Sequence, residues 1–132
     1  MADVEWAMMC DYAFQDSGRK TCLIGIFDRI FSAAVPTVLN RASLAMKVVG
    51  ESKEKASVKI EIVRPTGGVL STLQADVELG DNGVAEIQVG IQGMPLPDFG
   101  LYAFNLYVGS ELSKAIGVAV SQPQQPIAAP GA

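Results

Sequence analysis

Apolar residues alternate with polar ones in segment after segment, and this period of two constrains the fold more than any other feature. From Leu73 to Leu79 every second residue is apolar, and the residues between them are Gln74, Asp76 and Glu78. Neighbouring side chains of a β-strand point to opposite faces, so the segment is predicted to be a strand with one buried face. The pattern predicts eight antiparallel strands, at residues 4–14, 20–27, 43–49, 56–64, 69–79, 84–91, 100–108 and 112–120.

Turn residues between these segments predict how neighbouring strands pair. A three-residue loop at 81–83 (Asp-Asn-Gly) sets Leu79 opposite Ala85 and Val77 opposite Ile87, so that apolar residues meet on one face. A two-residue loop would oppose inward and outward residues, which favours the longer loop. By the same argument, loop 109–111 pairs Val108 with Leu112, Phe104 with Ile116 and Tyr102 with Val118, and loop 16–18 pairs Tyr12 with Cys22 and Cys10 with Ile24.

Two connections interrupt this series of hairpins and are predicted to cross between sheets. The first is 29–42, with at most a short helical turn before Pro36. The second is 92–99, where Pro95 and Pro97 exclude a central strand because proline cannot donate to the ladder. Regular short strands with such crossings predict an all-β, immunoglobulin-like antiparallel β-sandwich.

The stretch after the second crossing carries the spacing of a tyrosine corner. Asp98, Gly100, Tyr102 and Phe104 alternate where an immunoglobulin-like domain has acid, glycine, tyrosine and cysteine. In such a corner the tyrosine ring packs inward and its hydroxyl bonds to the backbone of the preceding connection. The alternative is that Tyr102 is simply one of several core aromatic residues. The spacing favours the corner.

Length and composition limit the domain count and the partners. A chain of 132 residues with 49% hydrophobic residues is predicted to form one sandwich domain over residues 1–120. Residues 121–132 contain three prolines and no periodicity, and they are predicted to be a flexible tail. The net charge of −4 argues against nucleic acid as a partner. Neither a secretory signal nor an apolar run of membrane-spanning length is visible, which predicts a cytoplasmic protein without membrane association.

Three stretches together resemble an uncharacterised bacterial family of short immunoglobulin-like proteins that has a domain of unknown function. They are residues 22–30 (CLIGIFDRI), Pro36 followed by 43–49 (SLAMKVV), and residues 93–112 (GMPLPDFGLYAFNLYVGSEL). The resemblance covers residues 4 to 120 and implies a small sandwich fold. It implies no activity, and the pattern positions are Gly25, Phe27, Asp28, Arg29, Gly100 and Tyr102.

The chain lacks the usual residues of an enzyme or a metal site. It has no histidine, which excludes Ser-His-Asp and Cys-His catalysis and the commonest zinc sites. Carboxylates at Asp76, Glu78 and Glu86 would lie on a solvated face, and Glu78, Asp81 and Asn82 lack the ligand pattern of an EF-hand. Hence we expect no catalytic residues, no cofactor and no metal. Cys10 and Cys22 are expected to be free thiols.

The first hairpin offers a candidate interaction surface. The even residues from Trp6 to Phe14 are predicted to face the core with Cys22, Ile24 and Ile26. That arrangement leaves Ala7, Met9, Leu23 and Phe27 as an apolar cluster on the outer face. Either the 29–42 crossing covers this cluster, which is favoured, or a protein partner or a second copy does.

Two functions are therefore expected in order of preference. The first is a non-catalytic binding or structural module that acts through protein–protein contacts, including self-association. The alternative is a small-ligand binder or enzyme with a pocket near Asp28, Arg29 and the 92–99 crossing. A structural role of Asp28 and Arg29 in shaping the loop is favoured over a binding role.

Overall fold

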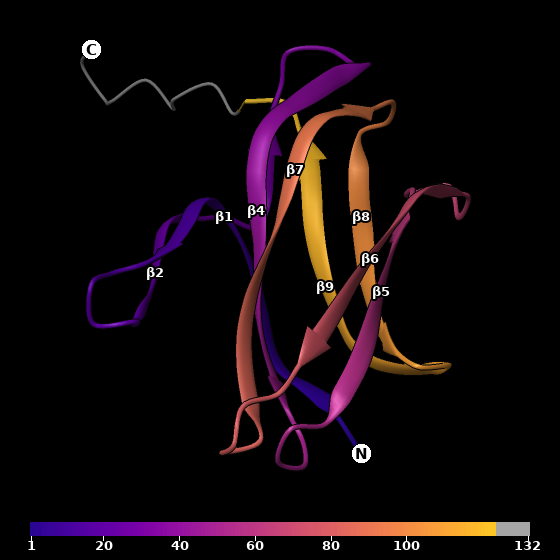
Figure 1. Cartoon of the computed structure of the whole chain (residues 1–132). Coiled ribbons are helices and arrows are strands. Elements are labelled where there is room, and N and C mark those ends of the chain that lie inside the picture. Colours follow the sequence, from indigo (N-terminus) through magenta and orange to yellow (C-terminus); the bar gives the residue numbers. More distant parts are fainter. Residues whose placement is uncertain (124–132) are drawn as a thin grey trace, which may run out of the picture.

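The computed structural model describes residues 1–123, and these form nine β-strands and no helix (Figure 1). Nearly all of the predicted tail, residues 124–132, lies outside the described residues. The strands are β1 (Asp3–Gln15), β2 (Thr21–Ile26), β3 (Arg29–Phe31), β4 (Thr37–Val49), β5 (Lys55–Val63), β6 (Val69–Glu78), β7 (Val84–Leu96), β8 (Gly100–Val108) and β9 (Glu111–Ser121).

The strands form two sheets that pack face to face. One sheet has the order β2-β1-β4-β7 and the other the order β3-β9-β8-β5-β6. Strands β4 and β7 take the places of strands B and E of an immunoglobulin domain, and β5, β8 and β9 those of C, F and G. The all-β, immunoglobulin-like sandwich is therefore confirmed, with nine strands in the described residues instead of eight.

The core lies between the two sheets and is filled by every second residue of the long strands. On β4 these are Ala42, Leu44, Met46 and Val48, all at most 2% exposed. The opposite sheet contributes Val58, Ile60, Ile62, Tyr102, Phe104, Leu106, Val118 and Val120. No charged or polar residue is buried in the described part of the chain, so the domain is held together by apolar packing.

The predicted pairing across loop 81–83 is wrong, although the turn itself is present. Gly83 has a φ of 74° and its N–H donates to the Gly80 carbonyl. However, β6 is an edge strand of one sheet and β7 is an edge strand of the other. Val77 and Ile87 are therefore not ladder partners. Both strands carry apolar residues on their inward faces, and sequence alternation alone cannot distinguish a hairpin from a connection between packed sheets.

The 29–42 connection is mostly strand and contains no helical turn. Its first three residues form β3, which runs parallel to β9 through Arg29↔Ala119 and Phe31↔Ser121. Its last residues begin β4, which therefore starts at Thr37. Similarly, β7 extends through the predicted 92–99 crossing to Leu96. Pro95 is compatible with β7 because this strand lies at the edge of its sheet.

The two remaining hairpins are partly as predicted. The pairs Phe104↔Ile116 and Tyr102↔Val118 are confirmed. A bulge between Leu106 and Tyr107 leaves a two-residue loop, so Val108 faces Glu111 and not Leu112. In the first hairpin the register is displaced by two residues, to Tyr12↔Ile24, Cys10↔Ile26 and Phe14↔Cys22.

A bulge also reverses the predicted faces of β1. Val4 pairs with Val48 but Trp6 pairs with Lys47, so Glu5 is an extra residue in the strand. Inward-facing residues are even-numbered before the bulge and odd-numbered after it, and Met9 is 2% exposed. Among the even-numbered residues predicted to face the core, only Cys10 is buried, whereas Met8, Tyr12 and Phe14 are exposed.

Candidate functional site

Strands β1 and β2 leave the sheet together as a two-stranded ribbon, residues 10–26. The first half of β1 pairs with β4 as far as Cys10↔Ser43, and the second half pairs with β2 alone. In Figure 1 this ribbon projects to the left of the two sheets. Each strand of the ribbon therefore has one unpaired backbone edge.

The ribbon folds back over the outer surface of its own sheet. Thr21 on β2 donates a hydrogen bond to the carboxylate of Glu86 on β7, although β2 and β7 are at opposite edges of the sheet. The Arg41 guanidinium lies 4.8 Å from the centre of the Tyr12 ring. Beneath the ribbon is a groove of about 460 Å³, whose lining includes Leu23 and Trp6. Leu23 therefore points toward the sheet.

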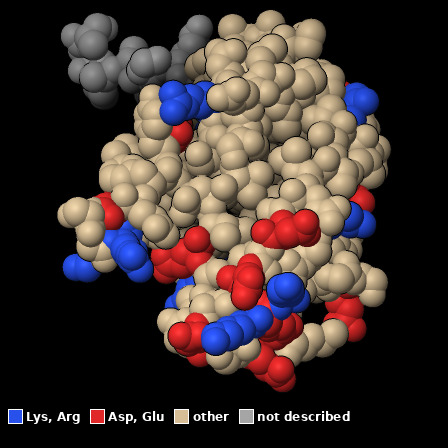
Figure 2. Space-filling view, in the orientation of Figure 1, with Lys and Arg blue, Asp and Glu red and all other residues tan. Residues whose placement is uncertain are grey.

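The opposite face of the ribbon is apolar and faces solvent. We call it the ribbon face; it consists of Tyr12, Phe14, Cys22, Ile24 and Ile26. Register pairs place these residues side by side on two strands. Tyr12 and Phe14 are 48% and 44% exposed, and Ile24 and Ile26 are 54% and 59% exposed. None of the five is charged. The Lys and Arg residues of the ribbon, Arg19 and Lys20, lie at its tip and line the groove beneath it. Figure 2 shows basic side chains at the left of the view, where Figure 1 places the tip of the ribbon.

The predicted interaction surface of Ala7, Met9, Leu23 and Phe27 does not exist as an outer face. Met9 belongs to the core, and Ala7 and Phe27 are half-buried against it. Leu23 lines the groove beneath the ribbon. The bulge at Glu5 is the cause, because it exchanges the two faces of β1. The apolar surface is on the same hairpin, but on the residues that were predicted to face the core.

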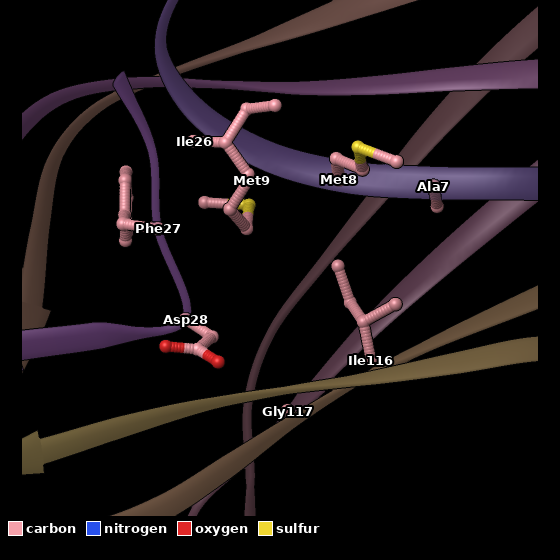
Figure 3. A pocket seen from close by; sticks show the side chains of 8 residues that line it. All are labelled: Ala7, Met8, Met9, Ile26, Phe27, Asp28, Ile116 and Gly117. Atoms are coloured by element: carbon pink, nitrogen blue, oxygen red, sulfur yellow. The ribbon is translucent and has the colours of Figure 1, made fainter.

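Three of these four residues instead line a pocket between β1 and β9. The pocket has a volume of about 330 Å³ and is lined by Ala7, Met8, Met9, Ile26, Phe27, Asp28, Ile116 and Gly117. Figure 3 shows Met9 and Ile116 pointing into the space between the two strands, with Asp28 at one end. Asp28 is exposed, and it forms no ion pair within residues 1–123.

Arg29 does not join Asp28 in this pocket. Its guanidinium donates to the Ser121 hydroxyl at 3.3 Å, and it lines a separate depression with Phe31, Ser121 and Gln122. Asp98, the acidic residue of the 92–99 segment, forms an ion pair with Arg64 and does not line this pocket. The structure therefore does not bring Asp28, Arg29 and this segment into one pocket.

The predicted tyrosine corner is present at the start of β8. The Tyr102 hydroxyl accepts a hydrogen bond from the Asp98 N–H at 2.9 Å and donates one to the Asp98 carbonyl at 3.1 Å. Burial raises the pKa of Tyr102, and the Asp98 N–H acts against that rise. Gly100 has a φ of 122°, and a Cβ there would lie 2.9 Å from Pro65. Phe104 is 1% exposed.

Arg64 completes the corner, and sequence reasoning missed it. Its Nε and Nη2 donate to the two carboxylate oxygens of Asp98 at 2.8 and 3.2 Å. These contacts raise the pKa of Arg64. The sequence offered one signal, which is Arg64-Pro65 at the end of a strand. In the fold this strand end lies beside the D-x-G-x-Y motif. The corner is therefore a structural site whose charges neutralise each other.

The remaining polar candidates lie apart from one another. Glu86 bonds to Thr21, whereas Asp76 and Glu78 lie on β6 in the other sheet. Asp81 contacts Lys53 at 3.5 Å. No cluster of three metal-binding side chains occurs in residues 1–123, and no helix there has the length and hydropathy of a membrane span.

Both cysteines are free in the structure. Cys10 is fully buried, and its Sγ lies 3.5 Å from the Ser43 carbonyl oxygen. Burial, and secondarily Asp11, raises the pKa of its thiol, which makes it a poor nucleophile.

Comparison with known proteins supports the fold and identifies the family. The alkylpurine DNA glycosylase AlkC of Pseudomonas fluorescens, solved bound to DNA with an abasic site analogue, aligns with a TM-score of 0.59 and 13% identity, over 91% of this chain. The match spans 30% of the glycosylase, so it shows the fold alone. An immunoglobulin-like protein of Pseudomonas aeruginosa aligns with a TM-score of 0.48 and 9% identity, over 91% of this chain and 96% of its own.

Sequence comparison gives a family and no characterised relative. No curated protein matches the chain. The model of a family of unknown function, DUF6941, matches residues 5–121, which is nearly the whole described sandwich. This confirms the resemblance that the Gly25–Arg29 and Gly100–Tyr102 segments indicated. The chain belongs to the family of unknown function DUF6941.

Proposed function

We propose that this protein is a non-catalytic interaction module and that the ribbon face binds the ribbon face of a second copy. The observation that carries the proposal is the ribbon face itself. It has four large apolar side chains that remain about half exposed, although Arg41 of β4 lies against the Tyr12 ring and Ile26 lines the pocket beside β9. Scattered apolar residues are normal on protein surfaces, but a contiguous group on two paired strands marks a contact site.

Charge supports a second copy as the occupant. In a two-fold symmetric dimer each residue near the axis meets its own counterpart, so a charged residue there would face a like charge. The ribbon face has no charged residue, so a two-fold contact there brings no like charges together. The centres of protein interfaces are likewise depleted in charged residues. The net charge of −4 disfavours nucleic acid as the partner.

The size of the ribbon face is adequate for a modest dimer. Four half-exposed large side chains offer roughly 300–400 Å² of apolar area. A standard interface buries ~800 Å² on each partner, so the backbone edges of the ribbon and its polar rim must contribute the remainder. We therefore expect a reversible dimer.

Light scattering behind a sizing column tests this proposal. Wild type is expected to show a dimer at high concentration, and Ile24→Asp a folded monomer, because it places a charge at the centre of the contact. Leu112→Asp is the matched control: Leu112 is 55% exposed but lies in β9, next to the turn from β8. This variant is expected to remain dimeric.

A wild-type monomer at every concentration would contradict the dimer. A dimer that persists in Ile24→Asp but dissociates in Leu112→Asp would place the contact elsewhere. Phe27→Asp is unsuitable as a test because Phe27 packs against the core.

A further inference from the structure

Strand β9 has an uncovered edge beside the pocket that contains Asp28. The short strand β3 pairs only with Ala119–Ser121. Along residues 111–118, no strand of the described chain pairs with that side of β9. The Ala119 N–H donates to the Asp28 carbonyl at 2.9 Å, away from β8. Backbone direction alternates along a strand, so Gly117 and Ala115 direct their N–H and C=O groups to this open side as well.

The open edge faces strand β1 across a slot that is closed at both ends. At one end, the Ser113 hydroxyl accepts from the Val4 N–H at 2.7 Å and donates to the Asp3 carboxylate. At the other end, the Phe27 N–H donates to the Met9 carbonyl at 2.9 Å. Between these bridges β1 and β9 share no ladder in the described structure. Five residues of β9, 114–118, lie between the Ser113 bridge and the pairing with β3, an ordinary strand length.

We propose that this slot binds an extended peptide of a partner protein. The peptide adds to the edge of β9 as a strand and buries one apolar side chain among Met9, Phe27 and Ile116. It carries a lysine or arginine two residues away, beside Asp28. In strand addition, main-chain hydrogen bonds provide the affinity and pockets for alternate side chains provide the specificity.

The lining of the pocket determines the chemistry of the peptide. Seven of its eight lining residues are uncharged, and Asp28 is the single charged one. Its carboxylate is exposed at one end of the pocket and has no cationic partner among residues 1–123 (Figure 3). An apolar pocket with one anion at its rim fits an apolar side chain next to a cation. The volume of about 330 Å³ is at the lower end of the range of ligand pockets.

Two synthetic peptides test strand addition and charge together. They are acetyl-Ser-Lys-Thr-Leu-Thr-Ser-Ser-amide and acetyl-Ser-Ser-Thr-Leu-Thr-Lys-Ser-amide, which place the lysine before or after the leucine. NMR titration of the full-length protein is expected to shift the amides of Ala7, Met9, Asp28, Ala115 and Gly117. Only one chain direction brings the lysine to Asp28, so one peptide is expected to bind about fivefold more tightly, the ceiling for an exposed ion pair.

Variants and a modified peptide separate the two contributions. Asp28→Asn is expected to abolish the difference between the peptides while the weaker affinity remains. Ala115→Pro removes one backbone N–H donor on the open side of β9 and leaves the hydrogen bonds to β8 in place. It is expected to weaken the binding of both peptides. Ala115→Ser is its control. N-methylation of the leucine nitrogen and both threonine nitrogens in the tighter peptide removes the donors that face β9 in either chain direction. This modification is expected to abolish binding, independently of how any protein variant folds.

Three outcomes would overturn the proposal. One is equal binding of the N-methylated peptide, because strand addition requires its N–H groups. Another is equal affinity of the two lysine peptides together with no effect of Asp28→Asn. The third is amide shifts confined to residues outside the slot. The ribbon face and the pocket share Ile26, so the two claims are separated at Ile24, which does not line the pocket: Ile24→Asp is expected to leave peptide binding unchanged.

Discussion

The tripeptide Tyr-Ala-Phe occurs twice in this chain, once in the ribbon and once in the tyrosine corner, with opposite results. At residues 102–104 the tyrosine and phenylalanine are 0% and 1% exposed, and at residues 12–14 they are 48% and 44% exposed. Both copies lie in β-strands. The difference is in what the strand faces: β8 is central in its sheet with the other sheet against it, whereas the ribbon has left its sheet.

This contrast shows that an aromatic strand pattern does not by itself indicate burial. In the corner, the Tyr102 hydroxyl satisfies the backbone N–H and carbonyl of Asp98, and its ring is buried in the core, so both ends of Tyr102 have partners. In the ribbon, Tyr12 has the guanidinium of Arg41 on its ring and solvent around the rest. The corner uses these side chains within the domain, and we propose that the ribbon uses the same side chains for contact with a second copy.

Truncation of the two phenylalanines should give the largest difference. Phe104→Ala is expected to lower the free energy of unfolding by about 3–5 kcal/mol, because it leaves a cavity in the core. Phe14→Ala should change it by no more than about 0.5 kcal/mol in the monomer. Urea unfolding at low protein concentration measures both. Similar losses in the two variants would show that the ribbon face is buried.

Removal of the two tyrosine hydroxyls should give a smaller difference. Tyr102→Phe leaves the Asp98 N–H and carbonyl without their partner and is expected to cost about 1–2 kcal/mol. Tyr12→Phe should be neutral. The raised pKa of Tyr102 means that the folded state holds its proton more tightly than the unfolded state. Stability should therefore be complete below the pKa of an unfolded tyrosine, near 10, and fall as the pH rises above it.

Tyr102→Phe should lose that alkaline dependence, and Tyr12→Phe should retain it. Unfolding in urea at a series of pH values from neutral to alkaline provides the measurement. A Tyr102→Phe variant that is destabilised at high pH as much as wild type would disprove the linkage.

The smallest expected effect concerns the position of the ribbon. Arg41→Ala removes the contact with the Tyr12 ring, which is worth about 0.5–1 kcal/mol at an exposed site. Proteolysis at the 16–20 loop should become faster, while unfolding of the sandwich should change little. Arg19→Ala, at the tip, serves as the control. No change in cleavage rate would show that the contact does not hold the ribbon against its sheet.

The corner was predictable from the sequence, and the ribbon was predictable only in part. D-x-G-x-Y is a local motif whose hydrogen bonds span four residues, so its geometry follows from its spacing. The faces of β1 depend on one extra residue, Glu5, and Ala7 and Met9 are as apolar as Met8 and Tyr12. When both faces are apolar, alternation cannot say which one is buried. The placement of β6 and β7 in different sheets was missed for a related reason. The inward-facing residues of two strands are apolar whether the strands pair in one sheet or pack from opposite sheets.

Amide hydrogen exchange, measured in wild type at low and at high protein concentration, tests the central claim most directly. Self-association through the ribbon face predicts slower exchange at high concentration for residues 12–14 and 22–26, while exchange at residues 102–104 stays the same at both concentrations. Exchange that is independent of concentration in the ribbon would contradict the claim, as would protection that increases only outside it.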